Sequence, residues 1–152
     1  MDKAQYKEVI SEAIQNEIDA RLFYEKVSAL IKDDYLKQLF ADFAKEEKKH
    51  ELILTGILQQ DKVGGRYFDF DKDFKVAETV DMPEVSKEMN LKDAIGLAMK
   101  NEQIAMDQYA ALAENCSDPD LKSVFLDLAA MERGHKHMME EKFVDVAFPE
   151  VW

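Results

Sequence analysis

Glu47-Lys-Lys-His50 and Glu132-Arg-Gly-His135 are the two stretches that decide how this sequence is interpreted. Each follows a further glutamate at the same distance, Glu17 in the first half and Glu102 in the second. When residues 7–50 are aligned with the residues 85 positions later, fifteen positions are identical. Agreement of this extent at one constant offset indicates an internal duplication. The duplication preserves four acids and two histidines, which is the ligand set of a two-metal site.

The composition indicates a globular protein and excludes several classes of function. The 152 residues are 47% hydrophobic and include only five Gly and three Pro, so we expect one domain over residues 1–152. The net charge of −12 disfavours nucleic acid and anionic membranes as partners. No signal peptide is recognisable after Met1, and no apolar run reaches the roughly 18 residues that span a bilayer. The single cysteine, Cys116, rules out an internal disulfide and suits a reducing cytoplasm, where we expect the protein.

Apolar residues recur every three or four positions in four long segments, a spacing typical of amphipathic helices. Asp2 and Asn90 are suited to cap the first and third helices, and Asp118-Pro119 is a strong start signal for the fourth. A turn near residues 32–34 separates the first helix from the second. These signals predict two helical hairpins.

The two predicted hairpins occupy residues 2–59 and 90–143, with a different composition between them at residues 60–89. A connection of this length is uncommon in a compact domain and usually has a purpose. If the hairpins are related by a pseudo-twofold axis, the chain must travel the length of the bundle between the second and third helices. The expected fold is therefore all-α, a ferritin-like four-helix bundle built from two duplicated hairpins with one long crossover connection. The tail, residues 144–152, is expected to leave the bundle.

The repeated acids fall at nearly one height in each hairpin. With a rise of about 1.5 Å per residue, Glu17 and Glu47 stand roughly 24 and 21 Å from the turn, and the second hairpin repeats the arithmetic. A glutamate and a histidine three residues apart project from one face of a helix. Buried carboxylates are costly unless they are paired, protonated or metal-bound, and oxygen ligands with one imidazole per metal suit iron or manganese. The predicted metal ligands are Glu17, Glu47, His50, Glu102, Glu132 and His135.

Other polar residues on the helices give weaker signals. Tyr24 and Tyr109 follow the first glutamate of each repeat by two turns, and either hydrogen-bond the ligand carboxylates or are core aromatics with hydroxyls satisfied elsewhere. His137 points away from the apolar face that contains His135 and is predicted to be a surface residue. Four further acids are predicted to lie on solvated helix faces: Glu46, Glu51, Glu140 and Glu141.

The order Glu, Glu-x-x-His, Glu, Glu-x-x-His on a duplicated four-helix pattern resembles the rubrerythrin group of ferritin-like proteins, over residues 2–142. The resemblance implies that Glu17 and Glu102 bind one metal each. It also implies that Glu47 and Glu132 bridge the metals, with His50 and His135 as terminal ligands. Two departures stand out: Ala105 replaces a further glutamate that rubrerythrins have, and the Cys-rich rubredoxin module of many members is absent from this sequence.

The resemblance implies a di-iron carboxylate oxidoreductase that reduces hydrogen peroxide or dioxygen, with two iron ions as cofactor and manganese or a mixed pair as alternatives. Electrons would come from an external donor such as a rubredoxin-like protein, and a homodimer is the family expectation. With Ala105 the two halves of the site are symmetric, as in bacterioferritin-type ferroxidase centres. A ferroxidase or iron-handling protein therefore stays open as an alternative, as does a dimetal oxygenase acting on an organic substrate.

Overall fold

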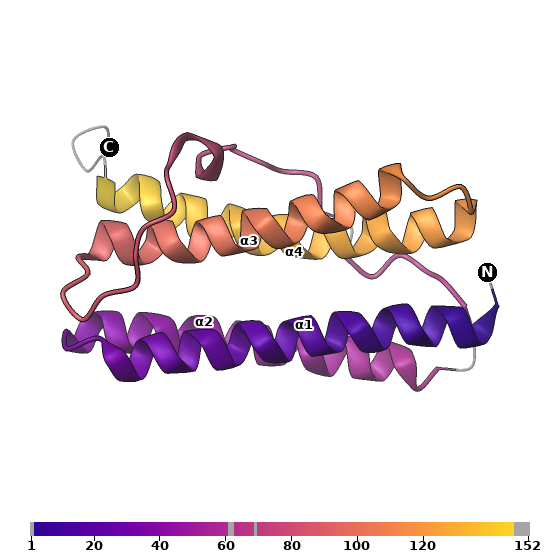
Figure 1. The fold of residues 1–152 in the computed structure, drawn as a ribbon, viewed down its shortest axis with the longest axis horizontal. Coiled ribbons are helices and arrows are strands. Elements are labelled where there is room, and N and C mark those ends of the chain that lie inside the picture. Colours follow the sequence, from indigo (N-terminus) through magenta and orange to yellow (C-terminus); the bar gives the residue numbers. More distant parts are fainter. Residues whose placement is uncertain (1, 61–62, 69, 148–152) are drawn as a thin grey trace. The chain divides into compact units, whose positions relative to one another are not determined.

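Four long helices make up most of the computed structural model, which describes residues 2–60, 63–68 and 70–147. The bounds are α1 Lys3–Leu30, α2 Asp34–Leu58, α3 Leu91–Glu114 and α4 Pro119–Ala147, with a short 3-10 helix, η1, at Ala77–Thr79. The described residues contain no strand, so the predicted all-α class with two helical hairpins is confirmed (Figure 1). None of the described helices combines the length and the apolar character that a membrane span requires.

Each long helix begins at a side chain that accepts a hydrogen bond from the first turn. Asp2 and Asn90, both predicted as caps, accept from the backbone N–H groups of the residues three positions later, at 2.8 Å each. Asp33 does the same for α2 at 3.0 Å, and Asp118 accepts from the Asp120 N–H at 2.9 Å. A cap of this kind stabilises a helix by about 1 kcal/mol because it satisfies an N–H that has no partner within the helix. The sequence therefore fixes where each helix starts.

The chain divides into two compact units, each of which contains one hairpin. The first consists of residues 1–63 with 85–88, and here α1 and α2 pack side by side (Figure 1). The core of this hairpin includes Tyr24, Phe40 and Phe43, which are fully buried and pack ring against ring. At its turn, the Ser28 hydroxyl donates to the Lys37 carbonyl at 2.7 Å, which ties the end of α1 to the first turn of α2.

The second unit consists of residues 64–84 with 89–152, so most of the crossover belongs to hairpin α3–α4. Figure 1 shows this segment running along that hairpin. Asp127 of α4 accepts hydrogen bonds from the N–H groups of Tyr67 and Phe68, at 3.1 and 3.0 Å. Arg133 donates to the carbonyl of Phe70 at 3.0 Å. The segment is thus attached to α4 through its own backbone, which satisfies polar groups that a crossover without regular structure would otherwise leave unpaired.

A buried ion cluster completes this attachment. Lys136 of α4 is fully buried, and its ammonium contacts the carboxylates of Asp73, Glu78 and Glu140, which together we call the Lys136 cluster. Glu140 is also fully buried and accepts from the N–H of Phe74 at 3.2 Å and from that of η1 residue Ala77 at 2.9 Å.

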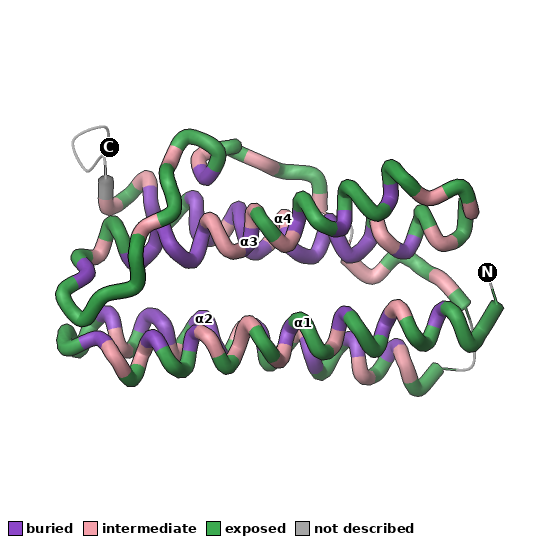
Figure 2. Tube along the Cα trace, viewed as in Figure 1, coloured by how far each residue is buried: buried purple, intermediate pink, exposed green. Residues whose placement is uncertain are grey.

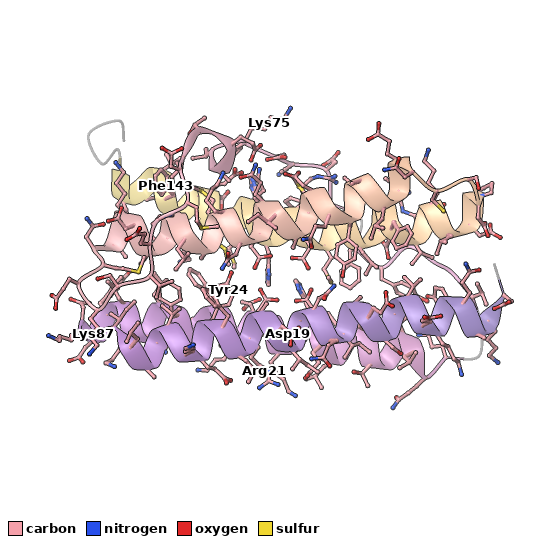
Figure 3. All side chains as sticks on the ribbon, viewed as in Figure 1. Asp19, Arg21, Tyr24, Lys75, Lys87 and Phe143 are labelled. Carbon is pink, nitrogen blue, oxygen red and sulfur yellow. The ribbon has the colours of Figure 1, made fainter. Side chains whose placement is uncertain are left out.

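The pKa values of Lys136 and Asp73 both shift in the direction that favours the charged form, so their ion pairing outweighs the effect of burial. Burial by itself lowers the pKa of Lys136, but the hydrogen bonds to Asp73, Glu78 and Glu140 raise it above its usual 10.5. Burial likewise raises the pKa of Asp73, yet the Lys136 ammonium and the Lys75 N–H hold it below its usual 3.8. Lys136 and Asp73 are therefore both charged at neutral pH. Figure 3 labels Lys75 on the crossover and Phe143 on α4.

The ends of hairpin α3–α4 differ from the expected limits in one respect. The fourth helix was predicted to end at residue 143, with a tail from residue 144 that leaves the bundle. In the structure α4 continues through Ala147, and Val144 and Val146 remain half-buried. The expected tail is therefore helical over residues 144–147. Residues 148–152 lie outside the described part of the chain.

Candidate metal centre

Three of the predicted ligands meet within hairpin α3–α4. Glu102 comes from α3, and Glu132 and His135 come from α4; all three are at most 4% exposed. One ligand atom from each lies within 4.8 Å of the others. His135 Nδ1 lies 3.4 Å from Glu102 Oε1. The spacing of the motif therefore produces a compact group of two carboxylates and one imidazole.

The burial of these acids follows from their position on the apolar face of each helix. Glu102 has the buried side chains of Ala98 and Met106 one turn before and one turn after it. On α4, Leu128 precedes Glu132 by one turn, and Met139 follows His135 by one turn. Figure 2 shows how buried positions recur along the helices. Ionised carboxylates at such positions are unfavourable by several kcal/mol unless a cation or a proton offsets their charge.

Hairpin α1–α2 repeats the arrangement. Glu17 of α1 and Glu47 of α2 are each 1% exposed, and His50 of α2 is half-buried. His50 Nδ1 lies 3.8 Å from Glu17 Oε2, the same pair of groups that meets in the other hairpin. In both copies the histidine of the second helix faces the first glutamate of the repeat. The duplication seen in the sequence therefore extends to the side-chain geometry inside each hairpin.

The donor set fits the metal that the sequence implies. Each hairpin contributes two carboxylates and one imidazole, which are the ligands that iron and manganese accept in proteins. In hairpin α3–α4 all three are buried among apolar neighbours, and their ligand atoms are close enough to contact one ion. Cysteine, which zinc and iron–sulfur centres favour, is absent from the group. The residues present are therefore suited to a carboxylate-rich dimetal site.

The two tyrosines proposed to support the ligands are both in the cores of their hairpins. Tyr24 is 1% exposed and packs against Phe23, Phe40 and Phe43 at ring-centroid distances of 5.7 to 5.9 Å. Tyr109 is 6% exposed on α3. These contacts agree with a core role, and the hydrogen bonds to ligand carboxylates stay a prediction.

Three polar residues that were expected on the surface are buried instead. The His137 ring packs edge to face against Phe74 of the crossover at 4.4 Å, and Glu140 belongs to the Lys136 cluster. Glu51 of α2 is 7% exposed, where it contacts Arg21 and Lys48. Each of these predictions assumed a helix with a single buried face. Acidic residues grouped in the crossover were the one available signal that a second face of α4 has a partner.

Comparison with protein-family profiles matches residues 8–142 to rubrerythrin, which covers nearly the whole of both hairpins. The chain belongs to the rubrerythrin family. Rubrerythrins are ferritin-like dimetal carboxylate proteins, and the matched range contains all six predicted ligands. The resemblance seen in the sequence is confirmed at the level of the family.

A solved structure from Pyrococcus furiosus, described only as a hypothetical protein, is similar to this rubrerythrin along its length. The two chains are 31% identical, the match covers 93% of this chain and 90% of the other, and the TM-score is 0.51. No curated protein is similar enough to match.

Proposed function

We propose that this rubrerythrin is a di-iron carboxylate oxidoreductase that reduces hydrogen peroxide, or dioxygen, with electrons from a separate carrier protein. The observation that supports the proposal most is the repeated buried set of two glutamates and one histidine. In hairpin α3–α4 its ligand atoms lie within 4.8 Å of each other. Reduction of one hydrogen peroxide to two waters consumes two electrons and two protons. A pair of iron ions supplies Lewis acidity and one electron from each ion.

The protein's own residues would bind and orient the metal pair. The four carboxylates offset the charge of two divalent cations, and each imidazole occupies one terminal position. The contact of His135 with Glu102, and that of His50 with Glu17, holds the histidine ring against the acid of the neighbouring helix. Ala98, Met106, Leu128 and Met139 exclude water around the second set, which strengthens every charge interaction there.

This sequence contains no Cys-rich iron site, which is the reason to propose a separate electron carrier. Its one cysteine, Cys116, cannot form a Cys-rich iron site, and it lies near the end of α3. We therefore assign re-reduction of the metal pair to a one-electron carrier that docks on the surface.

A ferroxidase is the second candidate, and Ala105 favours it. The residue stands three positions after Glu102, where rubrerythrins have a further glutamate, and it makes the two repeats equivalent at that position because Ala20 is its counterpart. A symmetric ligand set has no additional acid to exchange for histidine when the metal changes oxidation state. Iron oxidation followed by release to a store is the chemistry that such symmetry suits.

The deciding experiment compares the two oxidants directly. The protein is loaded with Fe(II) without oxygen, and oxidation is followed by stopped-flow absorbance after one equivalent of hydrogen peroxide or dioxygen. Faster oxidation by peroxide supports the peroxide reductase, and faster oxidation by dioxygen supports the ferroxidase.

Glu132→Ala tests the ligand assignment, with Glu46→Ala as its control. Glu132 is buried in the group, whereas Glu46 is half-exposed and pairs with Lys49. We expect Glu132→Ala to abolish stable binding of two metals per chain, measured by metal analysis after gel filtration, and Glu46→Ala to retain both. Two metals bound to Glu132→Ala would refute the assignment.

A further inference from the structure

An open groove of about 420 Å³ lies along hairpin α1–α2, within the first unit. Its sides are Arg21, Glu25 and Ser28 from α1, and Ala41, Lys45 and Lys48 are among its residues from α2. The hollow exists because small side chains stand where the two helices meet: Ala41 and Ala44 on α2 face Ser28 on α1. Arg21 is labelled on α1 in Figure 3.

The groove has a positive excess on an acidic chain. Three basic side chains line it, Arg21, Lys45 and Lys48, and the net charge of the whole sequence is −12. Arg21 pairs with Glu25 and Glu51 at 3.4 and 3.6 Å, and Lys48 also pairs with Glu51. Lys45 is exposed and has no ion-pair partner among the residues that the structure describes. A negatively charged partner would therefore meet a local attraction here in spite of the overall repulsion.

An apolar side chain extends the same strip of α2. Leu52 follows Lys48 by four residues, which places it one turn further along the same face, and it is 59% exposed. The large apolar side chain next to basic ones gives the surface the mixed character of protein-docking sites, where an apolar contact is surrounded by charges. We call Arg21, Lys45, Lys48 and Leu52, with the groove between them, the basic groove.

The duplicated hairpin shows what this face can hold. The residues 85 positions after Lys48 and Leu52 are Arg133 and His137. In hairpin α3–α4 both are covered by the chain's own crossover: Arg133 donates to the Phe70 carbonyl at 3.0 Å, and His137 packs against Phe74. One copy of the face thus binds an extended segment through a basic side chain that donates to a backbone carbonyl and through a ring contact. In the other copy Lys48 and Leu52 keep the same positions and are exposed.

The basic groove is close to the predicted metal ligands of its own hairpin. Lys48 directly follows Glu47, about 100° around the helix, and Arg21 lies one turn after Glu17. A partner in the groove is therefore separated from these ligands by little more than the width of one helix, about 10 Å. An electron carrier needs to approach the metals this closely without entering the buried site.

We propose that the basic groove is the docking surface for an acidic one-electron carrier protein that supplies the metal pair. The inference rests on the proposed redox function. The carrier contributes carboxylates to Lys45, Lys48 and Arg21 and an apolar patch to Leu52, and it delivers one electron in each encounter. Two encounters return both metals to the reduced state.

The test measures binding alone, so that it is independent of turnover. An oxidised rubredoxin of acidic net charge is titrated into the metal-free protein at 20 and 200 mM NaCl, and the dissociation constant is measured by calorimetry. The variant Lys45→Glu/Lys48→Gln removes the charge of the groove. The control Lys92→Glu/Lys122→Gln changes the net charge by the same amount on exposed positions of α3 and α4.

We expect the groove variant to weaken binding about tenfold at 20 mM NaCl and much less at 200 mM, because salt screens exposed charges. The control variant should stay within about twofold of the wild type. Leu52→Ala should weaken binding by about threefold at both salt concentrations, since an apolar contact is not screened.

Three results would overturn the proposal: no binding by the wild type at low salt, equal weakening by the control variant, or loss of self-association in the groove variant by light scattering. The last result would assign the groove to a second copy of the chain. Because no metal or peroxide is present, the binding result stands apart from the stopped-flow comparison. The binding test can contradict the docking surface while the stopped-flow comparison supports peroxide reduction. The opposite pair of results can also be recognised.

Discussion

Replacement of Lys136 by methionine is the perturbation for which the structure gives the clearest expectation. Methionine keeps a long side chain in the buried space but removes the ammonium that three carboxylates share. The side chains of Asp73 and Glu78 are 16% and 34% exposed and can turn toward water. Glu140 is fully buried and keeps only the N–H groups of Phe74 and Ala77. The variant therefore leaves one buried carboxylate without its counter-ion.

Breaking a buried ion pair by removing one partner costs about 3–5 kcal/mol. The lower end applies here, about 3 kcal/mol, because two of the three acids reach solvent and the third retains two backbone donors. For a chain of this length each kcal/mol lowers the melting temperature by about 2–4 °C, so the metal-free variant should melt about 6–12 °C below the wild type. The exposed residue Lys142 provides the control, and Lys142→Met on the same helix should shift the melting temperature by no more than about 2 °C.

The assay is urea unfolding of the metal-free proteins at pH 7, followed by circular dichroism. A second substitution gives a change of sign: Glu140→Gln should destabilise the wild type, where it removes an ion pair, but stabilise Lys136→Met, where it removes an unpaired buried charge. The cost of Lys136→Met should also shrink below about pH 4, as the pH falls through the lowered pKa of Asp73 and this partner of Lys136 takes up a proton. A loss below about 1 kcal/mol, or destabilisation by Glu140→Gln in both backgrounds, would refute the reasoning.

Four further predictions concern individual positions. Gly134→Ala and Gly56→Ala should each raise stability by about 0.5–1 kcal/mol in thermal melts, because a Cβ meets only ordinary contacts or open space within these helices. Gly65→Ala should destabilise by more than that, because its φ is +128° and Tyr67 lies 2.9 Å from the added atom. Because its folded-state pKa is below 3.8, Asp73 contributes stability that is full above about pH 4 and is lost as pH falls through that pKa. Asp73→Asn should therefore cost less at pH 3 than at pH 7 in urea titrations. Ala105→Glu should increase peroxide turnover severalfold if the missing family acid limits it, and unchanged turnover in a steady-state assay would contradict that account.

The sequence was sufficient for the helices and for the pairing of ligands inside each hairpin. Asp2, Asn90 and Asp118 mark helix starts through a local hydrogen bond, which depends on three or four neighbouring residues and on nothing distant. The contact of Glu102 with His135 follows from equal distances to a turn. Local geometry therefore transfers directly from sequence to structure.

The environment of α4 did not follow from the sequence in the same way. His137, Lys136 and Glu140 all belong to the polar part of the helix in a single-face pattern, and all three are buried. What covers them is the crossover, more than fifty residues earlier in the chain, which has no periodic signal of its own. When an acidic segment covers a second face of a helix, that face carries polar side chains, because the carboxylates of the segment need partners there. The exposure of a polar residue on such a helix can therefore be predicted only when the segment that packs against it is known.

The wrongly predicted exposure on α4 can be compared with the equivalent positions of hairpin α1–α2, because the two hairpins are duplicated. The repeat assigns Lys48 and Leu52 to the positions of Arg133 and His137, so the same single-face pattern describes one covered surface and one exposed surface. The two surfaces differ because the chain has one crossover, which covers the surface on hairpin α3–α4. A single exposed leucine is ordinary on a protein surface, so Leu52 is informative only through its position beside Lys48 and the groove. The support for the proposed docking surface is therefore the combination of a hollow lined by basic side chains with a counterpart face in the other hairpin that the crossover covers.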